Sequence, residues 1–315
     1  MSQTVRVGVV GVGYLGRIHA KIYSAMPGVE LVGVADTDAA ARDAVAAQYG
    51  CKPFARAEDM IGKVDAVSIV VPTVHHLETA RPFLTAGVHM LMEKPLAPTL
   101  DAARELVALA ERAGKVFQVG HLERFNAGMM ELARRVVAPR FIEVHRIGSF
   151  VERATDVDVV TDLMIHDIDI VLDLVRRPIR SVAATGVPVM TDYVDIANAR
   201  LEFEGGAVAN VTASRVSTKK QRRIRVFAHN AYYALDFVDQ QVEVAEAIPS
   251  PGGGRPEIRL EKLAIEPKPP LDAELAAFIE CVRTGATPLV TGAAGLEALR
   301  VAMLVKERML ECLKT

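Results

Sequence analysis

The sequence has little net charge, few cysteines and no long apolar run. Lys and Arg number 37 against 39 Asp and Glu, a formal charge of −2, so no overall field attracts nucleic acid or an anionic membrane. The three cysteines stand far apart without metal-ligand spacing, which excludes a disulfide scaffold and indicates reduced thiols. No stretch approaches the roughly 20 apolar residues of a membrane span, and residues 5–10 run into glycines rather than a signal-peptide cleavage site. We therefore expect a cytoplasmic protein with no nucleic-acid, membrane or metal partner.

The chain is long enough for two domains. Its 315 residues, 50% of them hydrophobic, suit two domains of about 150 residues each. The first part alternates short apolar runs with helix-length amphipathic stretches, which is typical of βαβ units in a parallel sheet. The runs are residues 5–10, 30–35, 66–71, 89–92 and 116–119, and the expected helices are 39–49, 76–86 and 100–113.

The later part of the chain has a different pattern. Strand-like runs joined by turn residues dominate from 180 to 263, with a helix before them near 161–175 and helices after them at 272–283 and 295–312. The clearest runs are 197–203, 207–213, 223–228 and 232–237. We therefore predict an α/β Rossmann domain, 1–122, followed by an α+β domain with a large, mainly antiparallel sheet, 123–315. The C-terminal helices within 272–315 are able to pack back on the first domain.

A glycine-rich segment, Gly11-Val12-Gly13-Tyr14-Leu15-Gly16, follows the first expected strand and opens a helix. In a dinucleotide-binding turn the first glycine permits the tight bend, the second lets the backbone approach a pyrophosphate, and the third lets helix and strand pack closely. Asp36 stands twenty residues beyond Gly16, where a carboxylate binds a ribose hydroxyl and repels a 2′-phosphate. The segment predicts NAD rather than NADP; the alternative is a structural turn with a solvated Asp36.

Lys94 lies between Glu93 and Pro95 at the end of the fifth apolar run. Proline disfavours helical geometry in the residue before it, so Lys94 should be extended at the carboxyl end of its strand, where open α/β sheets bind ligands. A lysine there can donate a hydrogen bond to a substrate oxygen and take part in proton transfer. The alternative is a solvated lysine.

A second set of polar residues lies in the predicted helix at 161–175. Asp162, His166 and Asp169 are spaced i, i+4 and i+7, which places them on one face of an α-helix. A carboxylate one turn from an imidazole can orient it as a general base. Two alternatives stand beside this: Asp162 caps its own helix while His166 is a half-buried structural residue, or the three ligate zinc.

Taken together, these motifs resemble the glucose–fructose oxidoreductase/inositol dehydrogenase (Gfo/Idh/MocA) family. The resemblance rests on the glycine segment, His19-Ala20, Pro72-Thr73 with His76, and Glu93-Lys94-Pro95. It implies NAD as cofactor and these cofactor-binding residues: Gly11, Gly13, Tyr14, Leu15, Gly16, Asp36, Pro72, Thr73, His76, Glu93 and Lys94. It further implies a catalytic set of Lys94, Asp162 and His166, which oxidises a secondary alcohol. We assign the base to His166, with Lys94 polarising the oxygen and Asp162 orienting the imidazole; Lys94 is the other possible base.

Within the family, short segments at 120–126 and 214–217 lean toward the UDP-N-acetylglucosamine 3-dehydrogenase type. We therefore expect oxidation of a secondary ring hydroxyl of a sugar nucleotide; the alternatives are an inositol or free-sugar dehydrogenase and a non-catalytic NAD-binding regulator. Arg124 and Asn126, just past the last parallel strand, are the expected additional substrate contacts. The basic run at 219–225 is either a diphosphate site or the solvated face of a strand. An uncovered sheet face in the second domain suggests a homodimer or homotetramer.

Overall fold

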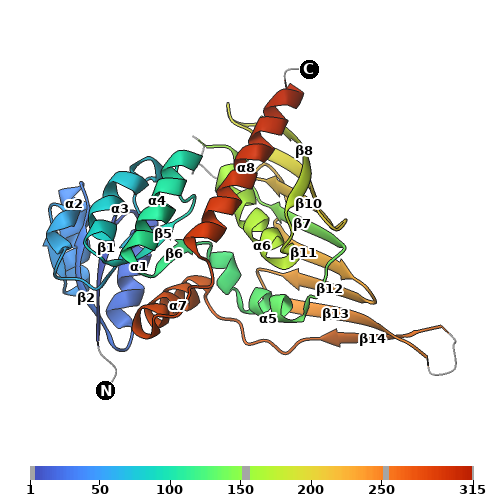
Figure 1. Ribbon diagram of the computed structural model, residues 1–315, viewed down its shortest axis with the longest axis horizontal. Helices are drawn as coiled ribbons and strands as arrows, with labels where there is room; N and C mark the ends of the chain where they lie inside the picture. Colours follow the sequence, from blue (N-terminus) through green and yellow to red (C-terminus); the bar gives the residue numbers. More distant parts are fainter. Residues whose placement is uncertain (1–3, 151–156, 251–254, 314–315) are drawn as a thin grey trace. The chain divides into compact units, whose positions relative to one another are not determined.

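The computed structural model describes residues 4–150, 157–250 and 255–313 (Figure 1). The chain forms two compact units, one made of residues 1–122 with 271–299 and the other of 123–270 with 300–315. Across the described ranges, no helix combines the length and the apolar character that crossing a membrane requires.

The first unit is built on a six-stranded parallel sheet in the order β3-β2-β1-β4-β5-β6. Its strands are β1 Val5–Val10, β2 Val29–Ala35, β3 Lys52–Phe54, β4 Ala66–Ile69, β5 His89–Glu93 and β6 Phe117–Gly120. Its helices are α1 Tyr14–Ala25, α2 Ala39–Tyr49, α3 His76–Thr85, α4 Leu100–Ala113 and α7 Pro270–Thr284. The strand order reverses between β1 and β4, and such a switch point is where doubly wound folds bind nucleotides. The predicted Rossmann fold is confirmed.

Apolar side chains from both ends of the chain form the core of this unit. Val7 and Val9 of β1 are fully buried and belong to one cluster with Leu275, Phe278 and Ile279 of α7. α7 therefore completes the first unit, although almost 150 residues separate it from β6. β3 is not predicted from the sequence, because it has only three residues, of which Lys52 and Pro53 are exposed.

The second unit is built on an eight-stranded sheet in the order β14-β13-β12-β11-β7-β10-β9-β8 (Figure 1). The strands are β7 Phe141–Ile147, β8 Ile179–Val187, β9 Ile196–Phe203, β10 Val208–Ser214, β11 Gln221–Ala228, β12 Ala231–Asp236, β13 Gln241–Ile248 and β14 Glu257–Lys262. All neighbours are antiparallel except β7 and β10. This confirms a mainly antiparallel sheet. No strand is predicted from the sequence at β7, which nevertheless lies in the middle of the sheet, between β11 and β10.

One face of this sheet carries the core. Along β9, Ala197, Ala199, Leu201 and Phe203 are buried and alternate with polar residues on the other face. The buried face packs against the helices α5 Ala127–Arg135 and α6 Ile165–Val175. The division between the two units falls inside the last helix, α8 Gly292–Leu313.

Candidate active site

The glycine loop between β1 and α1 depends on three glycines for three different reasons. Gly11 has φ +87°, and a Cβ there would lie 2.4 Å from the carbonyl oxygen of Val70. A Cβ at Gly16 would lie 1.8 Å from the carbonyl oxygen of Gly11, so α1 can approach the loop only without a side chain. A Cβ at Gly13 would meet nothing within 4 Å. The backbone at Gly13 is therefore open to an incoming group, as binding of a pyrophosphate at the start of a helix requires.

Asp36 follows β2 and is tied to the glycine loop. Its carboxylate accepts hydrogen bonds from the backbone N–H of Val12 at 2.6 Å and of Asp38 at 2.8 Å. Asp36 therefore fixes the loop from the neighbouring strand end, and the alternative of a merely solvated side chain does not describe it.

A cleft of about 1010 Å³ runs along the carboxyl ends of these strands. Seven of the expected cofactor-binding residues line it: Gly11, Gly13, Leu15, Asp36, Pro72, Glu93 and Lys94. This volume is close to the upper limit of the range for small-molecule and cofactor sites, about 300–1,000 Å³. The open backbone of Gly13, the placement of Asp36 and the size of the cleft all fit a dinucleotide such as NAD.

Four other expected cofactor residues lie elsewhere. Tyr14 is 75% exposed, Gly16 serves the packing of α1, and Thr73 begins a short 3₁₀ turn beside the cleft. His76 is buried, with its ring nitrogens 3.1 Å from the carbonyl oxygen of Leu96 and 3.0 Å from that of Val71. Burial lowers the pKa of His76, so it is a neutral structural residue that joins two loops.

Several further residues that the sequence does not single out also line the cleft, among them Arg56, His75 and Glu78. The distance between His75 Nδ1 and Glu78 Oε1 is 2.6 Å. Their only sequence signal is position: Arg56 follows β3, and the other two follow Pro72-Thr73 at the end of β4.

Lys94 comes directly after β5, at the carboxyl edge of the sheet, and lines the cleft. Its backbone N–H donates to the carboxylate of Glu93 at 3.3 Å, and the Lys94–Pro95 peptide bond is cis. This is the strand-end position that the Glu-Lys-Pro sequence predicts.

In the second unit, Asp162 and His166 lie where a π-helical turn, Val160–Met164, continues into α6. The predicted helix is therefore not a regular α-helix at Asp162, because its first turn is π-helical. Asp169 is 2% exposed and its carboxylate lies 3.4 Å from the Arg124 guanidinium. π turns of this kind are frequent at functional sites.

Asp158 rather than Asp162 caps this turn. The Asp158 carboxylate accepts hydrogen bonds from the backbone N–H groups of Val160 and Thr161, both at 3.0 Å, and from the Thr161 hydroxyl. Lys306 of α8 lies 2.7 Å from the same carboxylate. Burial raises the pKa of Asp158, but Lys306 and Thr161 outweigh burial and lower it overall. The side chain of Asp162 is thus not needed as the cap.

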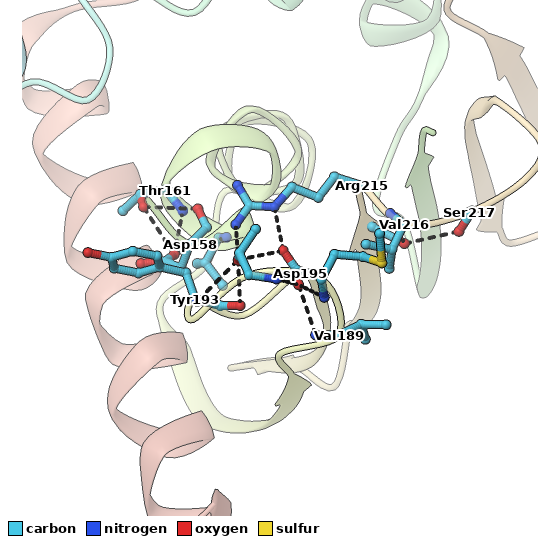
Figure 2. A network of polar contacts seen from close by, with 12 residues as sticks. Asp158, Thr161, Val189, Tyr193, Asp195, Arg215, Val216 and Ser217 are labelled. Atoms are coloured by element: carbon cyan, nitrogen blue, oxygen red, sulfur yellow. Dashed lines mark hydrogen bonds and ion pairs between the residues drawn. The ribbon is translucent and has the colours of Figure 1, made fainter. Parts of the chain in front are cut away.

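A buried network holds the segment in front of the turn (Figure 2). Asp195, fully buried, accepts from the backbone N–H groups of Val189, Met190 and Thr191 at 2.7–2.9 Å, and from Arg215 Nε at 2.8 Å. The next residue back, Val194, accepts the backbone N–H of Val159 at 3.0 Å. Asp195 therefore fixes the loop at 189–194, and the residue just before the π turn, Val159, is hydrogen-bonded to this loop.

Arg124, Asn126 and Arg146 of this region make polar contacts within the second unit. Arg124 is 6% exposed and lies 2.9 Å from Asp173 in addition to its contact with Asp169. Asn126 caps α5 through its side-chain oxygen and donates to the carbonyl of Phe237 at 3.0 Å. Arg146 is buried between Asp167 at 2.7 Å and Glu123 at 2.6 Å. Within the described ranges no group of three or more His, Cys, Asp and Glu side chains could hold a metal ion.

The basic run of β11 is paired with acids of the same unit. Arg223 lies 3.4 Å from Glu243, Arg225 pairs with Glu143, and Arg222 lies 3.9 Å from Glu123. Arg223 and Arg225 lie on the charged face of β11, whereas Arg222 lies on the same face as the buried Ile224 and Val226.

Comparison with known proteins agrees with both units. The model of an oxidoreductase family with an NAD-binding Rossmann fold matches residues 5–121, and the GFO/IDH/MocA C-terminal domain matches 127–234. UDP-N-acetylglucosamine 3-dehydrogenase from Acidithiobacillus ferrooxidans is 35% identical over 96% of both chains. Its solved structure has a TM-score of 0.90 and covers 97% of both chains.

A second kind of relative acts on cyclitols. scyllo-Inositol 2-dehydrogenase (NAD(+)) from Bacillus subtilis is 29% identical over 92% of this chain and 90% of its own. A putative myo-inositol dehydrogenase structure from Sinorhizobium meliloti, 24% identical over 98% of both chains, shows the same fold with a TM-score of 0.80. The chain belongs to the GFO/IDH/MocA family of oxidoreductases, and its cofactor is NAD.

Proposed function

We propose that this protein oxidises a secondary ring hydroxyl of a sugar nucleotide, converting UDP-N-acetylglucosamine to its 3-keto form. The observation that carries the proposal is the 35% identity to a UDP-N-acetylglucosamine 3-dehydrogenase over 96% of both chains. The cleft of the first unit, with Asp36 and Lys94 in its wall, supplies the chemistry such a reaction needs.

The mechanism uses three residues of this chain. Bound NAD supplies the hydride acceptor. Lys94 donates a hydrogen bond to the reacting oxygen and polarises it, and His166 takes the hydroxyl proton, with Lys94 as the alternative base. Asp162 orients the imidazole. Arg124 and Asn126 are the additional substrate contacts of the proposal; the Arg124 guanidinium lies against Asp169 and Asp173, and Asn126 donates to the Phe237 carbonyl.

Inositol oxidation is the second candidate, since two inositol dehydrogenases are 28–29% identical over more than nine-tenths of this chain. A cyclitol has no diphosphate, so the two reactions separate in a substrate panel. NADH formation is measured with UDP-N-acetylglucosamine, with myo-inositol and with UDP. Turnover with the sugar nucleotide supports the proposal, and turnover with inositol alone overturns it. A non-catalytic regulator would bind NAD and turn over neither.

The Lys94→Ala variant tests the catalytic assignment. We expect turnover to fall by roughly 10²–10⁴ when proton transfer is lost, while NAD still binds. Lys21→Ala, at an exposed position on α1, is the matched control and should keep full turnover. Unchanged turnover in Lys94→Ala would contradict the role of this lysine.

A homodimer or homotetramer in the cytoplasm completes the proposal. The apolar side chains Ile258 and Leu260 of β14 are 67% and 77% exposed, as expected for a strand that another copy covers. Light scattering behind a sizing column gives the subunit number, and a monomer would contradict this part.

A further inference from the structure

A buried group of ionisable side chains lies beside Lys94 in the first unit. We call it the acid cluster: His19 of α1, Glu93 of β5 and Glu274 of α7. Their exposed fractions are 0%, 6% and 0%. His19 Nε2 lies 3.4 Å from Glu93 Oε1. The Glu93 carboxylate also packs against β6, because a Cβ at Gly120 would lie 2.9 Å from it.

The acid cluster is poor in partners. Among the described residues, neither carboxylate oxygen of Glu274, nor Oε1 of Glu93, nor either ring nitrogen of His19 has a hydrogen-bond partner. Buried polar atoms in folded proteins almost always have partners, so orphans in one place point to a functional reason. The Glu93 carboxylate does accept one bond, from the backbone N–H of Lys94.

Ionising two neighbouring buried carboxyl groups at once has a high free-energy cost, because the like charges repel and both are desolvated. Burial, and then the negative charge of Glu93, raise the pKa of Glu274 well above its usual value. Glu274 is fully enclosed, whereas Glu93 reaches the wall of the cofactor cleft and accepts an N–H. Glu274 is therefore the member of the pair that keeps its proton, and the carboxylate that faces the cleft is that of Glu93.

Two further ionisable groups near the acid cluster, Tyr23 and His76, carry no charge that would offset it. Burial raises the pKa of the Tyr23 hydroxyl, which is bonded to Ser68 at 2.9 Å, so it is neutral. Burial lowers the pKa of His76, so that imidazole is neutral as well. The cation nearest in sequence is Lys94, which lies in the same wall of the cleft.

We propose that the acid cluster places one negative charge, on Glu93, in the wall of the cofactor cleft, and that this charge favours the oxidised over the reduced cofactor. The nicotinamide ring is cationic in NAD⁺ and neutral in NADH, so a nearby carboxylate stabilises only the first. Asp36 marks the adenosine end of the cleft, and Glu93 and Lys94 mark the other. The inference rests on the proposed role of Lys94 at the reacting end.

The test is the ratio of the two cofactor dissociation constants, Kd(NADH)/Kd(NAD⁺), measured by calorimetry on the full chain without substrate. Glu93→Gln removes the charge and should lower this ratio roughly tenfold, the order expected for one charge–charge interaction at an effective dielectric constant of about 20. Glu93→Asp keeps the charge and should leave the ratio within about twofold of the wild type.

Glu274→Gln is the matched control, because it replaces a neutral acid by a neutral amide in the same cluster. We expect its ratio to match the wild type. An unchanged ratio in Glu93→Gln, or an equal shift in Glu274→Gln, would overturn the proposal.

Glu93→Met is the second variant in case the amide does not fold, since apolar replacement of a buried charge is often tolerated. It should lower the ratio as Glu93→Gln does. These ratios need no turnover, so they can fail while the Lys94→Ala test succeeds, and the reverse.

Discussion

In the first unit the loop at residues 11–16 keeps its shape because side-chain atoms are absent, whereas in the second unit the turn carrying Asp162 is held in place by charges. Gly16 leaves room for α1 against the Gly11 carbonyl. Asp195 and Arg215 instead tie together a loop and a strand end that a hydrophobic core alone would not align. The stability of the first unit, the cofactor half, is thus sensitive to added side-chain volume. The stability of the second unit, the helix half, is sensitive to the loss of a charge.

The largest expected effect is on the helix half. Arg146→Met leaves Asp167 and Glu123 buried without their cation, so we expect the free energy of unfolding to fall by about 3–5 kcal/mol. Urea unfolding followed by circular dichroism measures it. Replacing Arg146, Asp167 and Glu123 together by apolar residues should recover much of the loss. A loss below about 1 kcal/mol for the single variant would show that these charges do not hold α6.

Added volume should break the cofactor half. Gly16→Ala places a methyl group 1.8 Å from a backbone oxygen, and we expect about 10- to 100-fold weaker NAD binding from a strain of about 1–3 kcal/mol. Gly13→Ala is the control, since no atom lies within 4 Å of its new methyl group. It should leave the melting temperature unchanged. It should weaken only NAD binding, because the new methyl group keeps the pyrophosphate from approaching the loop backbone. Equal melting temperatures for both variants would contradict the packing argument.

Loss of one charge in the Asp195 network should have a smaller effect that depends on pH. Burial acts to raise the pKa of Asp195, but its backbone N–H donors and Arg215 outweigh burial and hold the pKa well below its usual value. The carboxylate therefore stabilises the fold above the unfolded-state pKa of about 3.9 and loses this contribution as the pH falls toward the folded-state pKa.

Asp195→Asn should accordingly cost about 1–3 kcal/mol at pH 7, as expected for buried donors that lose their acceptor. Below pH 4 the difference from the wild type should shrink. Thermal melts of both proteins between pH 3 and pH 7 measure this. A difference that stays constant down to pH 3 would show that the charge of Asp195 is not what matters.

The smallest expected effect is that of removing the exposed charge of Arg223, in contrast to the buried charges above. Arg223 is paired with Glu243 on the open part of β11, and Arg223→Ala should change stability by less than about 1 kcal/mol. Its KM for the sugar nucleotide should stay within about twofold. A tenfold higher KM would show that the basic run binds the diphosphate, against the pairing seen here.

The sequence predicted best what depends on neighbouring residues. Gly11, Gly13, Asp36 and Lys94 were identified from one turn, one strand end and one Glu-Lys-Pro segment, and the structure brings all four to one cleft. The fold class was predictable for the same reason, because strand and helix periods are local.

What depends on distant partners was not predictable. β7 pairs with β10 across more than 60 residues, and Arg215 reaches Asp195 from 20 residues away. Nothing near Arg124 in the sequence indicates that Asp169 and Asp173 bind its guanidinium. The π turn at Val160–Met164 is likewise too short for its hydrophobic pattern to differ from that of an α-helix.

Hydride transfer from a defined carbon tests the central claim most directly. UDP-N-acetylglucosamine carrying deuterium at C3 is mixed with the purified protein and NAD, and the products are examined by mass spectrometry. We predict that the deuterium appears in the reduced cofactor and that the sugar nucleotide becomes a 3-keto compound. Reduced cofactor without deuterium would contradict oxidation at C3, and no reduction with this substrate, together with turnover of myo-inositol, would contradict the sugar-nucleotide assignment itself.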